Sequence, residues 1–425
     1  MIHARSTHRI VSIVILMSLA GCLHPYGKPV PPDLAVGMRE RVDLSAPPSA
    51  YRRVDPETAN RMIAHFAAAD AEPTGPRRDV LVLSGGGTFG AFTAGVLVGW
   101  SQTGTRPMFD CVTGVSTGAL VATLAFLGPE YDNTLAQIAV SVNAKKIYRL
   151  RRPVSILWSA SVASSEPLEK LIDSVVDAKL LGEVAKRHAE GRRLYVGTTN
   201  LEAKQLVVWD MGAIASRGNA EALKLFRTVL LASCAIPGFF APVPIEVEID
   251  GQRYTELHVD GGASASMFLR WPEIPPALAA EMQRQVQEGH RPLTGSNLYI
   301  IVSGKLFADA SPVRLGFVPV AGSSLTSLLY AEARGDLYSL FTGSLVSGTK
   351  YHLTSLPQDF SVNPDATSFD AGDMRRLFDE GVRIGKLPNP WRTMPPGPEI
   401  SEQTIPRAGV RFATPEKVGP PAQKQ

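Results

Sequence analysis

The sequence has little net charge, few cysteines and only a short apolar run near its start. Its 43 Lys and Arg residues nearly balance 40 Asp and Glu residues, so the formal charge is +3 over 425 residues. Contacts to nucleic-acid phosphates call for a basic surface, so this balance offers no case for a nucleic-acid partner. No set of His, Cys and acidic residues has the spacing of metal ligands. We therefore expect neither a metal nor a cofactor.

The three cysteines do not form a disulfide framework. Cys22 lies near the start of the chain, whereas Cys111 and Cys234 stand in apolar surroundings. Such cysteines are typical of buried thiols. A bridge between Cys111 and Cys234 is the alternative.

The first 21 residues have the features of an export signal. A basic start is followed by the apolar run Ile10 to Leu19, which is too short to span a membrane as a helix. The run leads into Leu19-Ala20-Gly21-Cys22, which resembles the bacterial lipobox, in which the cysteine is acylated and becomes the first mature residue. An ordinary signal peptide with an incidental cysteine is the alternative. Cleavage there would remove Arg5 and Arg9 and lower the formal charge from +3 to +1.

The expected product is an exported bacterial lipoprotein, held at a membrane surface through Cys22. Leu23 follows the cysteine, where an Asp commonly marks retention in the inner membrane, so we expect the periplasmic side of the outer membrane. The sequence divides into a signal peptide at 1–21, a lipid-anchored Pro-rich tether at 22–78, a catalytic domain at 79–385 and a Pro-rich tail at 386–425.

Short β-rich runs alternate with longer helical patterns in the central part of the chain, which predicts an α/β fold with a mostly parallel sheet covered on both faces. We expect strands at residues 79–84, 109–113, 194–199, 205–209, 245–249, 254–259 and 298–302, the last being the final strand of the sheet. Helices are expected at residues 91–100, 119–127, 219–235, 324–340 and 371–384, with a further helix opening at Ser165.

A Gly-x-Ser-x-Gly motif, Gly114 to Gly118, stands between a predicted strand and a predicted helix. A serine hydroxyl is a weak nucleophile, so an acyl-transfer enzyme exposes it at a sharp turn between small residues and places a base beside it. Gly114 and Gly118 would permit that turn, and the following helix would offer its N-terminal N–H groups to negative charge. Ser116 is therefore the candidate nucleophile. A purely structural, glycine-lined turn is the alternative.

A glycine segment, with Gly85, Gly86, Gly87 and Gly90, follows the first predicted strand. Glycine N–H groups can approach an oxyanion without obstruction by a side chain, so the segment is a candidate oxyanion hole. It also fits the Gly-x-Gly-x-x-Gly pattern of dinucleotide-binding proteins, with Asp110 at the expected distance. Asp110 stands at the front of its strand, however, and so belongs at the edge of the sheet opposite the glycine segment. We therefore reject the dinucleotide hypothesis.

Asp260, Gly261 and Gly262 follow directly on the predicted strand 254–259. Alone, such a segment is most often a turn. Its place at the end of a strand would bring the carboxylate to the sheet edge where loops gather, near the other two motifs.

In this order the three motifs closely resemble the patatin-like phospholipases, a family of lipid acyl hydrolases. Phe109-Asp110 before the nucleophile strand and the run Ala232 to Phe240 are also similar to that family. The resemblance spans roughly residues 79–385. It implies a three-layer α/β/α fold and a catalytic dyad in which Asp260 accepts the proton of Ser116 without a histidine. It also implies a lipid or other acyl-ester substrate and no metal.

The sequence departs from the family at Phe89, where a basic residue usually precedes the last glycine. Activity is expected to persist, reduced or shifted toward less polar substrates. Two alternatives stay open: an inactive envelope lipoprotein that binds lipid, and an acyltransferase that uses the same nucleophile. His258 is the one histidine worth testing as an alternative base, and a structural role is favoured for it. The other histidines after Ser116 have no recognisable setting: His188, His290 and His352.

A basic cluster lies between the nucleophile and the helix that opens at Ser165. It consists of Lys145, Lys146, Arg149, Arg151 and Arg152, and apolar residues from Val154 to Trp158 follow it. The cluster could attract anionic lipid headgroups beside the site. A solvated basic face is the alternative.

Overall fold

The structure of the protein is a computed structural model. It describes residues 27–28, 30–31, 78–156, 158–249, 251–269, 296–309, 312–347 and 349–396. The signal peptide and Cys22 lie outside the described residues, as do most of the predicted tether and of the C-terminal tail. The division of the chain into these segments stays a prediction.

Within the described ranges, eight strands form one mixed sheet in the order β10-β9-β1-β2-β5-β8-β7, with β6 paired to β5 off this path. Neighbouring strands from β10 to β5 are parallel, whereas β6, β7 and β8 pair in antiparallel fashion. The strands of this sheet are β1 (Asp79–Leu83), β2 (Cys111–Val115), β5 (Arg193–Asn200), β6 (Gln205–Asp210), β7 (Val243–Ile249), β8 (Gln252–Asp260), β9 (Asn297–Val302) and β10 (Lys350–Ser355). Two short strands, β3 (Arg149–Leu150) and β4 (Ala163–Ser164), pair with each other apart from it.

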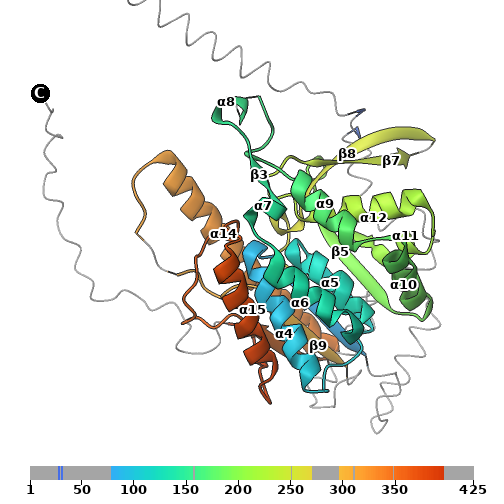
Figure 1. Cartoon of the computed structure of the whole chain (residues 1–425), viewed down its shortest axis with the longest axis vertical. Coiled ribbons are helices and arrows are strands. Elements are labelled where there is room, and N and C mark those ends of the chain that lie inside the picture. Colours follow the sequence, from blue (N-terminus) through green and yellow to red (C-terminus); the bar gives the residue numbers. More distant parts are fainter. Residues whose placement is uncertain are drawn as a thin grey trace, which may run out of the picture.

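Helices cover both faces of the sheet (Figure 1). The α-helices of the described residues are α4 (Gly90–Gln102), α5 (Thr117–Leu127), α6 (Asp132–Ser141), α7 (Ala144–Ile147), α8 (Pro153–Ile156), α9 (Glu166–Val175), α10 (Ala178–Ala189), α11 (Met211–Ala215), α12 (Ala220–Ser233), α14 (Phe317–Ser347) and α15 (Ala371–Gly385). Short 3-10 turns are η3 (Gly87–Phe89), η4 (Pro129–Tyr131) and η5 (Gly261–Ala263).

Alternate side chains of β1 pack into two separate hydrophobic cores, one on each face of the sheet. Leu81 and Leu83 are buried in the larger core, which α4, α5 and α15 share. Val82 points the other way and packs with Leu337 and Leu340 of α14. Successive residues of a strand face opposite sides of a sheet, so a continuous apolar strand requires cover on both sides. This arrangement confirms the predicted three-layer α/β/α fold with a mostly parallel sheet.

Two predicted elements differ from the structure. The prediction that 298–302 is the last strand of the sheet is wrong, because β10 adds a further parallel strand beside β9. The strand before the nucleophile runs from Cys111 to Val115 rather than over 109–113, so it ends directly at Ser116. The remaining predicted strands and helices are present, with ends shifted by a few residues and α14 longer than expected.

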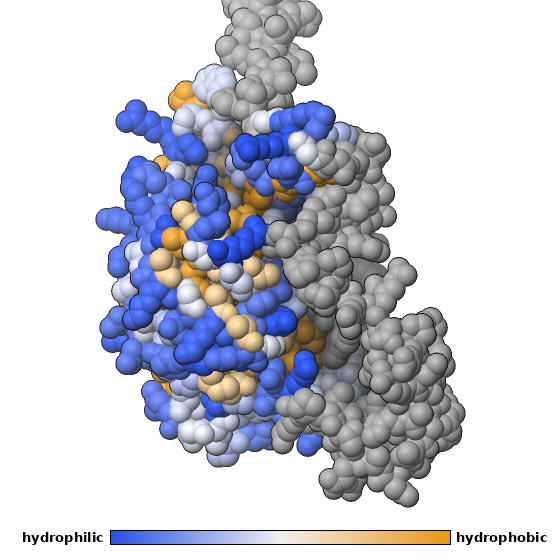
Figure 2. Space-filling model, turned by 90° about the vertical axis from the view of Figure 1, so that its right-hand side faces the viewer, coloured by the Kyte–Doolittle hydropathy of each residue, from blue (hydrophilic) through white to orange (hydrophobic). Residues whose placement is uncertain are grey.

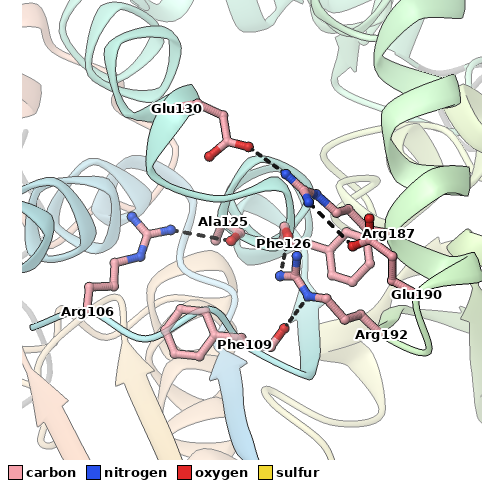
Figure 3. A network of polar contacts seen from close by, with 8 residues as sticks. All are labelled: Arg106, Phe109, Ala125, Phe126, Glu130, Arg187, Glu190 and Arg192. Atoms are coloured by element: carbon pink, nitrogen blue, oxygen red, sulfur yellow. Dashed lines mark hydrogen bonds and ion pairs between the residues drawn. The ribbon is translucent and has the colours of Figure 1, made fainter.

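Two arginines bind the end of α5 that is far from Ser116 (Figure 3). Arg106 donates to the carbonyl of Ala125, and Arg192 donates to that of Phe126. Carbonyls in the last turn of a helix have no partner within the helix and carry its negative dipole end, so guanidinium groups stabilise them. Arg187 lies alongside and pairs with Glu130 and Glu190. The helix behind the candidate nucleophile is therefore held at its C-terminal end.

A short N-terminal segment packs on the hairpin of β7 and β8. The carbonyl of Lys28 accepts a hydrogen bond of 2.8 Å from the backbone N–H of Thr255, and its ammonium group lies over the ring of Tyr254. Val30 is buried in a small cluster with Ile249 and Tyr254. Part of the predicted tether thus lies against the β7–β8 hairpin of the sheet.

None of the described helices is long and apolar enough to cross a membrane.

Candidate active site

Ser116 stands at the turn between β2 and α5 with a strained backbone. Its φ of 55° and ψ of −132° lie outside the regions that a residue with a side chain ordinarily adopts. Small neighbours make the turn possible: a Cβ on Gly118 would lie 2.4 Å from the carbonyl oxygen of Ser84. The strand and helix thus meet as the Gly-x-Ser-x-Gly motif predicted, with Ser116 first in line at the N-terminus of α5.

The Ser116 hydroxyl donates a hydrogen bond of 2.6 Å to Oδ2 of Asp260. Both residues are only 5% exposed. The other carboxylate oxygen, Oδ1, accepts a hydrogen bond of 2.8 Å from the N–H of Gly262. Asp260 is therefore oriented by its own Asp-Gly-Gly turn, with one oxygen held by the backbone and the other facing the serine.

The strand register brings these two residues together across β5. Val115, the last residue of β2, pairs with Gly197, and the next residue of β5, Thr198, pairs with Asp260. β8 runs antiparallel to β5 and overlaps only its last residues. The end of β8 thereby reaches the edge of the sheet at which the parallel strands also end.

Burial raises the pKa of Asp260 from 3.8 to about 6, and the hydrogen bonds from Ser116 and Gly262 oppose this rise. Desolvation disfavours a charged carboxylate, whereas donors that bind the ionised form favour it. With a pKa near 6 the group is mostly ionised at neutral pH and yet basic enough to take up a proton. That combination suits a general base.

The glycine segment lies against the serine. A Cβ on Gly85 would lie 3.1 Å from the Cβ of Ser116. The N–H of Gly85 is bound to the carbonyl of Ser266, and that of Thr88 is bound to the carbonyl of Ala366. Among the described residues, no group accepts a hydrogen bond from the N–H of Gly86 or of Gly87. Two backbone donors thus stay available directly after Gly85, the residue of the segment that adjoins Ser116.

Gly90 begins α4 and adjoins the residue after the nucleophile, because a Cβ there would lie 2.9 Å from the Cβ of Thr117. Gly114 lies within β2 directly beneath α5, where a Cβ would lie 2.5 Å from the carbonyl oxygen of Gly118. Gly261, which follows Asp260, is buried against β5. Each predicted glycine therefore lies in the wall of the site.

Two side chains that support the site were not singled out from the sequence. Ser233, at the end of α12, accepts a hydrogen bond of 2.9 Å from the N–H of Ser116 and donates one of 2.7 Å to the carbonyl of Gly197. Asp336 of α14 accepts hydrogen bonds from the N–H groups of Ser266 and Met267. Ser233 stands in the patatin-like run 232–240, which was its only signal. Asp336 had none, because it is distant in sequence from every motif.

His258 belongs to a different cluster. Its Nδ1 lies 2.8 Å from the hydroxyl of Thr198 and its Nε2 lies 3.0 Å from the carboxylate of Glu256. Trp209 donates to the same Thr198 hydroxyl and packs near the imidazole. Both nitrogens of His258 are thus occupied away from Ser116, which agrees with the favoured structural role.

Within the described ranges, His188 and His352 do not approach the dyad either. His188 lies beside Asp210 at 3.6 Å, and His352 stacks on Tyr299. His290 lies outside the described residues.

Phe89, where the family usually has a basic residue, is half-buried and packs against the larger core. A Cβ on Gly304 would lie 3.9 Å from its ring, so the phenyl group is directed toward the end of β9. Its apolar contacts explain why this chain accepts a phenylalanine there.

The two remaining cysteines are free thiols, so the alternative of a disulfide between them is wrong. Cys234 is buried near Asp260, and Cys111 is half-buried. Burial, together with the nearby Asp260 charge, raises the pKa of Cys234 well above its ordinary value. It is therefore a neutral thiol rather than a rival nucleophile. Among the described residues, no group of three or more His, Cys, Asp and Glu side chains could hold a metal ion.

The fold and the site define an α/β protein with a serine at a strained strand-to-helix turn, paired with a buried carboxylate. A comparison with protein families matches residues 81–270 to Patatin-like phospholipase. This match confirms the predicted resemblance over these residues. It supports a lipid acyl hydrolase in general terms.

Solved structures add distant similarities. VipD from Legionella pneumophila is 14% identical with a TM-score of 0.34, and the match covers 72% of this chain and 68% of VipD. The type III effector protein ExoU is 11% identical with a TM-score of 0.29, and the match covers 74% of this chain and 54% of ExoU, so the matched part spans about half of that protein. Neither likeness bears on the activity of this chain. A comparison with curated proteins gives no match.

Proposed function

We propose that the protein is a serine acyl hydrolase in which Ser116 attacks an ester carbonyl and Asp260 accepts its proton. The observation that carries this proposal is the 2.6 Å hydrogen bond from the Ser116 hydroxyl to Asp260 at a buried, strained turn. A carboxylate that is bonded directly to the nucleophile can take up its proton without a histidine between them.

In the first half of the reaction, the Ser116 oxygen forms a bond to the carbonyl carbon while its proton moves to Oδ2 of Asp260. The carbonyl oxygen becomes an oxyanion, which the N–H groups of Gly86 and Gly87 and the N-terminus of α5 stabilise. The intermediate then collapses: the bond to the leaving alcohol breaks, and that oxygen takes the proton from Asp260.

In the second half, Asp260 removes a proton from water as the water oxygen attacks the acyl-enzyme. The bond to Ser116 breaks, and the serine oxygen recovers the proton. Neither step requires a metal or a cofactor. We propose a glycerophospholipid or another acyl ester as the substrate, which the family match supports.

A serine-directed fluorophosphonate probe tests the nucleophile. We expect it to label Ser116 in the wild-type chain and to leave Ser116→Ala unlabelled. Ser174→Ala removes an exposed serine of α9 and serves as the matched control that keeps labelling. Failure of the wild-type chain to label would refute the enzyme proposal and favour a lipid-binding protein without activity.

The base and the acceptor need separate tests. Asp260→Asn should lower ester turnover by at least about 100-fold, whereas retained turnover would direct attention to another base, with His258→Asn as the variant to compare. Adding a competing alcohol to the assay distinguishes transfer of the acyl group to water from transfer to an alcohol. Acylated alcohol in place of free fatty acid would make the protein an acyltransferase.

We also propose that the chain is exported, acylated at Cys22 and held at the periplasmic side of the outer membrane. The lipobox-like residues Leu19 to Cys22 support this proposal. Metabolic labelling with palmitate and membrane fractionation test it. Label retained in Cys22→Ala, or wild-type chain in the soluble fraction, would contradict it.

A further inference from the structure

Two exposed segments extend outward from the part of the structure that surrounds Ser116 and Asp260. The basic hairpin, residues 149–164, comprises β3, α8 and β4, and the outer segment of α14 comprises residues 319–329. Figure 1 draws α8 at the top and the outer end of α14 at the upper left. Both segments are tied to the site by hydrogen bonds, so their surroundings bear on how a substrate reaches Ser116.

The basic hairpin is fastened to the segment that precedes Asp260. The N–H groups of Val162 and Ala163 donate to the carbonyls of Gly238 and Phe239, at 3.1 and 2.9 Å. A few residues earlier in that segment, the carbonyl of Ala235 accepts a hydrogen bond from the N–H of Asp260. The hairpin therefore starts beside the candidate base and extends outward.

The outer segment of α14 is fastened on the other side. Asp336 of the same helix binds the N–H groups of Ser266 and Met267, and the carbonyl of Ser266 binds the N–H of Gly85. The inner part of α14 thus touches the backbone that holds the glycine segment, and its outer part continues away from the core.

Both segments expose large apolar side chains. Val154 of the hairpin is 67% exposed, and Leu328 of α14 is also 67% exposed. Other exposed apolar side chains of the two segments are Leu150, Trp158, Val162, Val320, Leu325 and Leu329. By contrast, the face drawn in Figure 2 is mostly hydrophilic, with apolar residues in small groups. Apolar side chains gathered on projecting segments indicate a surface that a partner covers.

The sequence around each of the two segments holds basic residues and no acidic ones. Between Asp132 and Glu166 the sequence holds five basic residues and no acidic one, and between Asp309 and Glu332 it holds Arg314 and no acidic residue. The five basic residues of the first stretch are all exposed: Lys145, Lys146, Arg149, Arg151 and Arg152. Arg149 pairs with Glu166 at 3.5 Å, at the end of this stretch. Apolar side chains beside an excess of basic ones match a bilayer with anionic headgroups, in which the former enter the acyl region and the latter bind phosphate.

The N-terminal segment places the proposed lipid on the same side. Lys28 and Val30 are held on the β7–β8 hairpin, which Figure 1 draws at the upper right. Five residues of chain from Cys22 to Gly27 can span at most about 18 Å. An acyl anchor on Cys22 would therefore hold that hairpin close to the bilayer, because only a short stretch of chain separates the anchor from it.

We propose that the basic hairpin, together with Lys145 and Lys146 of α7 just before it and the outer segment of α14, forms a docking face for an anionic phospholipid bilayer. Docking turns the sheet edge with Ser116 and Asp260 toward the lipid, so that an acyl chain passes from the bilayer to the serine without crossing water. This inference rests on the proposed acyl hydrolase and on the proposed anchor at Cys22.

Vesicle partitioning of the full chain with Cys22→Ala tests the face without the anchor. We measure the partition coefficient for phosphatidylglycerol-containing vesicles and divide it by that for pure phosphatidylcholine vesicles. Binding through the N-terminal apolar run contributes to both coefficients and therefore cancels in this ratio. The test variant is Lys145→Gln/Lys146→Gln/Arg152→Gln. Each basic residue near an anionic surface contributes about fivefold, so the ratio should fall roughly 100-fold.

The matched control removes the same charge elsewhere. Lys179, Lys186 and Lys224 are exposed on α10 and α12, which Figure 1 draws to the right of and below the docking face. Their triple Gln variant should keep the wild-type ratio. An equal loss in both triple variants, or no loss in the test variant, would overturn the proposal.

Contact with the lipid has an independent readout in the lipidated wild-type background. An environment-sensitive dye on Leu328→Cys should be quenched by brominated lipid, and the same dye on Lys179→Cys should not. Equal quenching at the two positions would refute docking through this face. Fluorophosphonate labelling of Ser116 without vesicles tests the proposed reaction separately, so the two proposals can fail independently.

Discussion

Asp260→Asn should lower ester turnover by at least about 100-fold and yet stabilise the fold. In the wild-type protein the Asp260 carboxylate is buried, and its pKa is raised from 3.8 to about 6. The folded protein therefore holds the Asp260 proton more tightly than the unfolded chain does. As pH rises from about 4 through 6, the unfolded chain ionises first, and the free energy of unfolding falls.

The magnitude follows from the difference in pKa. The pKa of Asp260 is about two units higher in the folded protein than in the unfolded chain. At pH 7.5, where Asp260 is ionised in both states, this difference lowers the free energy of unfolding by about 3 kcal/mol. At pH 4.5 the same linkage gives only about 1 kcal/mol, because the folded protein keeps its proton there. Asparagine carries no charge and offers an oxygen to Gly262. We therefore expect Asp260→Asn to stabilise the protein by up to about 3 kcal/mol at pH 7.5 and by about a third of that at pH 4.5.

Urea unfolding at the two pH values, followed by tryptophan fluorescence, measures this difference. Ester turnover should fall by about 100-fold to 10,000-fold in the same variant, the range that general-base catalysis supplies. A variant that is no more stable than the wild type at pH 7.5, or a gain that is equal at the two pH values, would refute the reasoning. Wild-type kcat/KM should also fall tenfold per pH unit below about 6, as Asp260 becomes protonated.

Three further substitutions test the groups that hold the site. Ser233→Ala leaves the N–H of the nucleophile without its acceptor, so kcat should fall about tenfold with little change in KM, and an unchanged kcat would count against the role. Asp336→Ala frees two N–H groups behind the glycine segment, and we expect slower fluorophosphonate labelling at an unchanged fold by circular dichroism. Asp132→Ala leaves the Arg106 guanidinium, whose side chain is 1% exposed, without its ion pair at 2.7 Å. That loss should cost about 3–5 kcal/mol in urea unfolding, with Arg106→Met/Asp132→Leu less destabilised than the single variant.

Much of the fold could be predicted because its signals are local. The short β-rich run of β1 and the helical patterns of α4 and α5 each act through neighbours in the chain. β10 was missed because its residues, Lys350–Ser355, form a short run in which polar side chains alternate with apolar ones. Only the partner β9 makes it a strand of the large sheet.

The candidate site divides in the same way. Ser116 and the glycine segment were found because each requires small residues at fixed spacing around a tight turn. The support from Ser233 and Asp336 could not be found, since each reaches the site from a distant helix through backbone groups that any residue carries.

The sequence by itself determined the resemblance to the family, the strand-to-helix turn at Ser116 and the presence of a carboxylate after a strand, because these depend on residue type and short spacing. Only the tertiary structure places the Asp260 carboxylate within hydrogen-bonding distance of the Ser116 hydroxyl. β8 runs against the parallel strands and overlaps β5 by a few residues, so its end stops beside the nucleophile. Burial in that place, which no motif encodes, raises the pKa of the carboxylate to about 6.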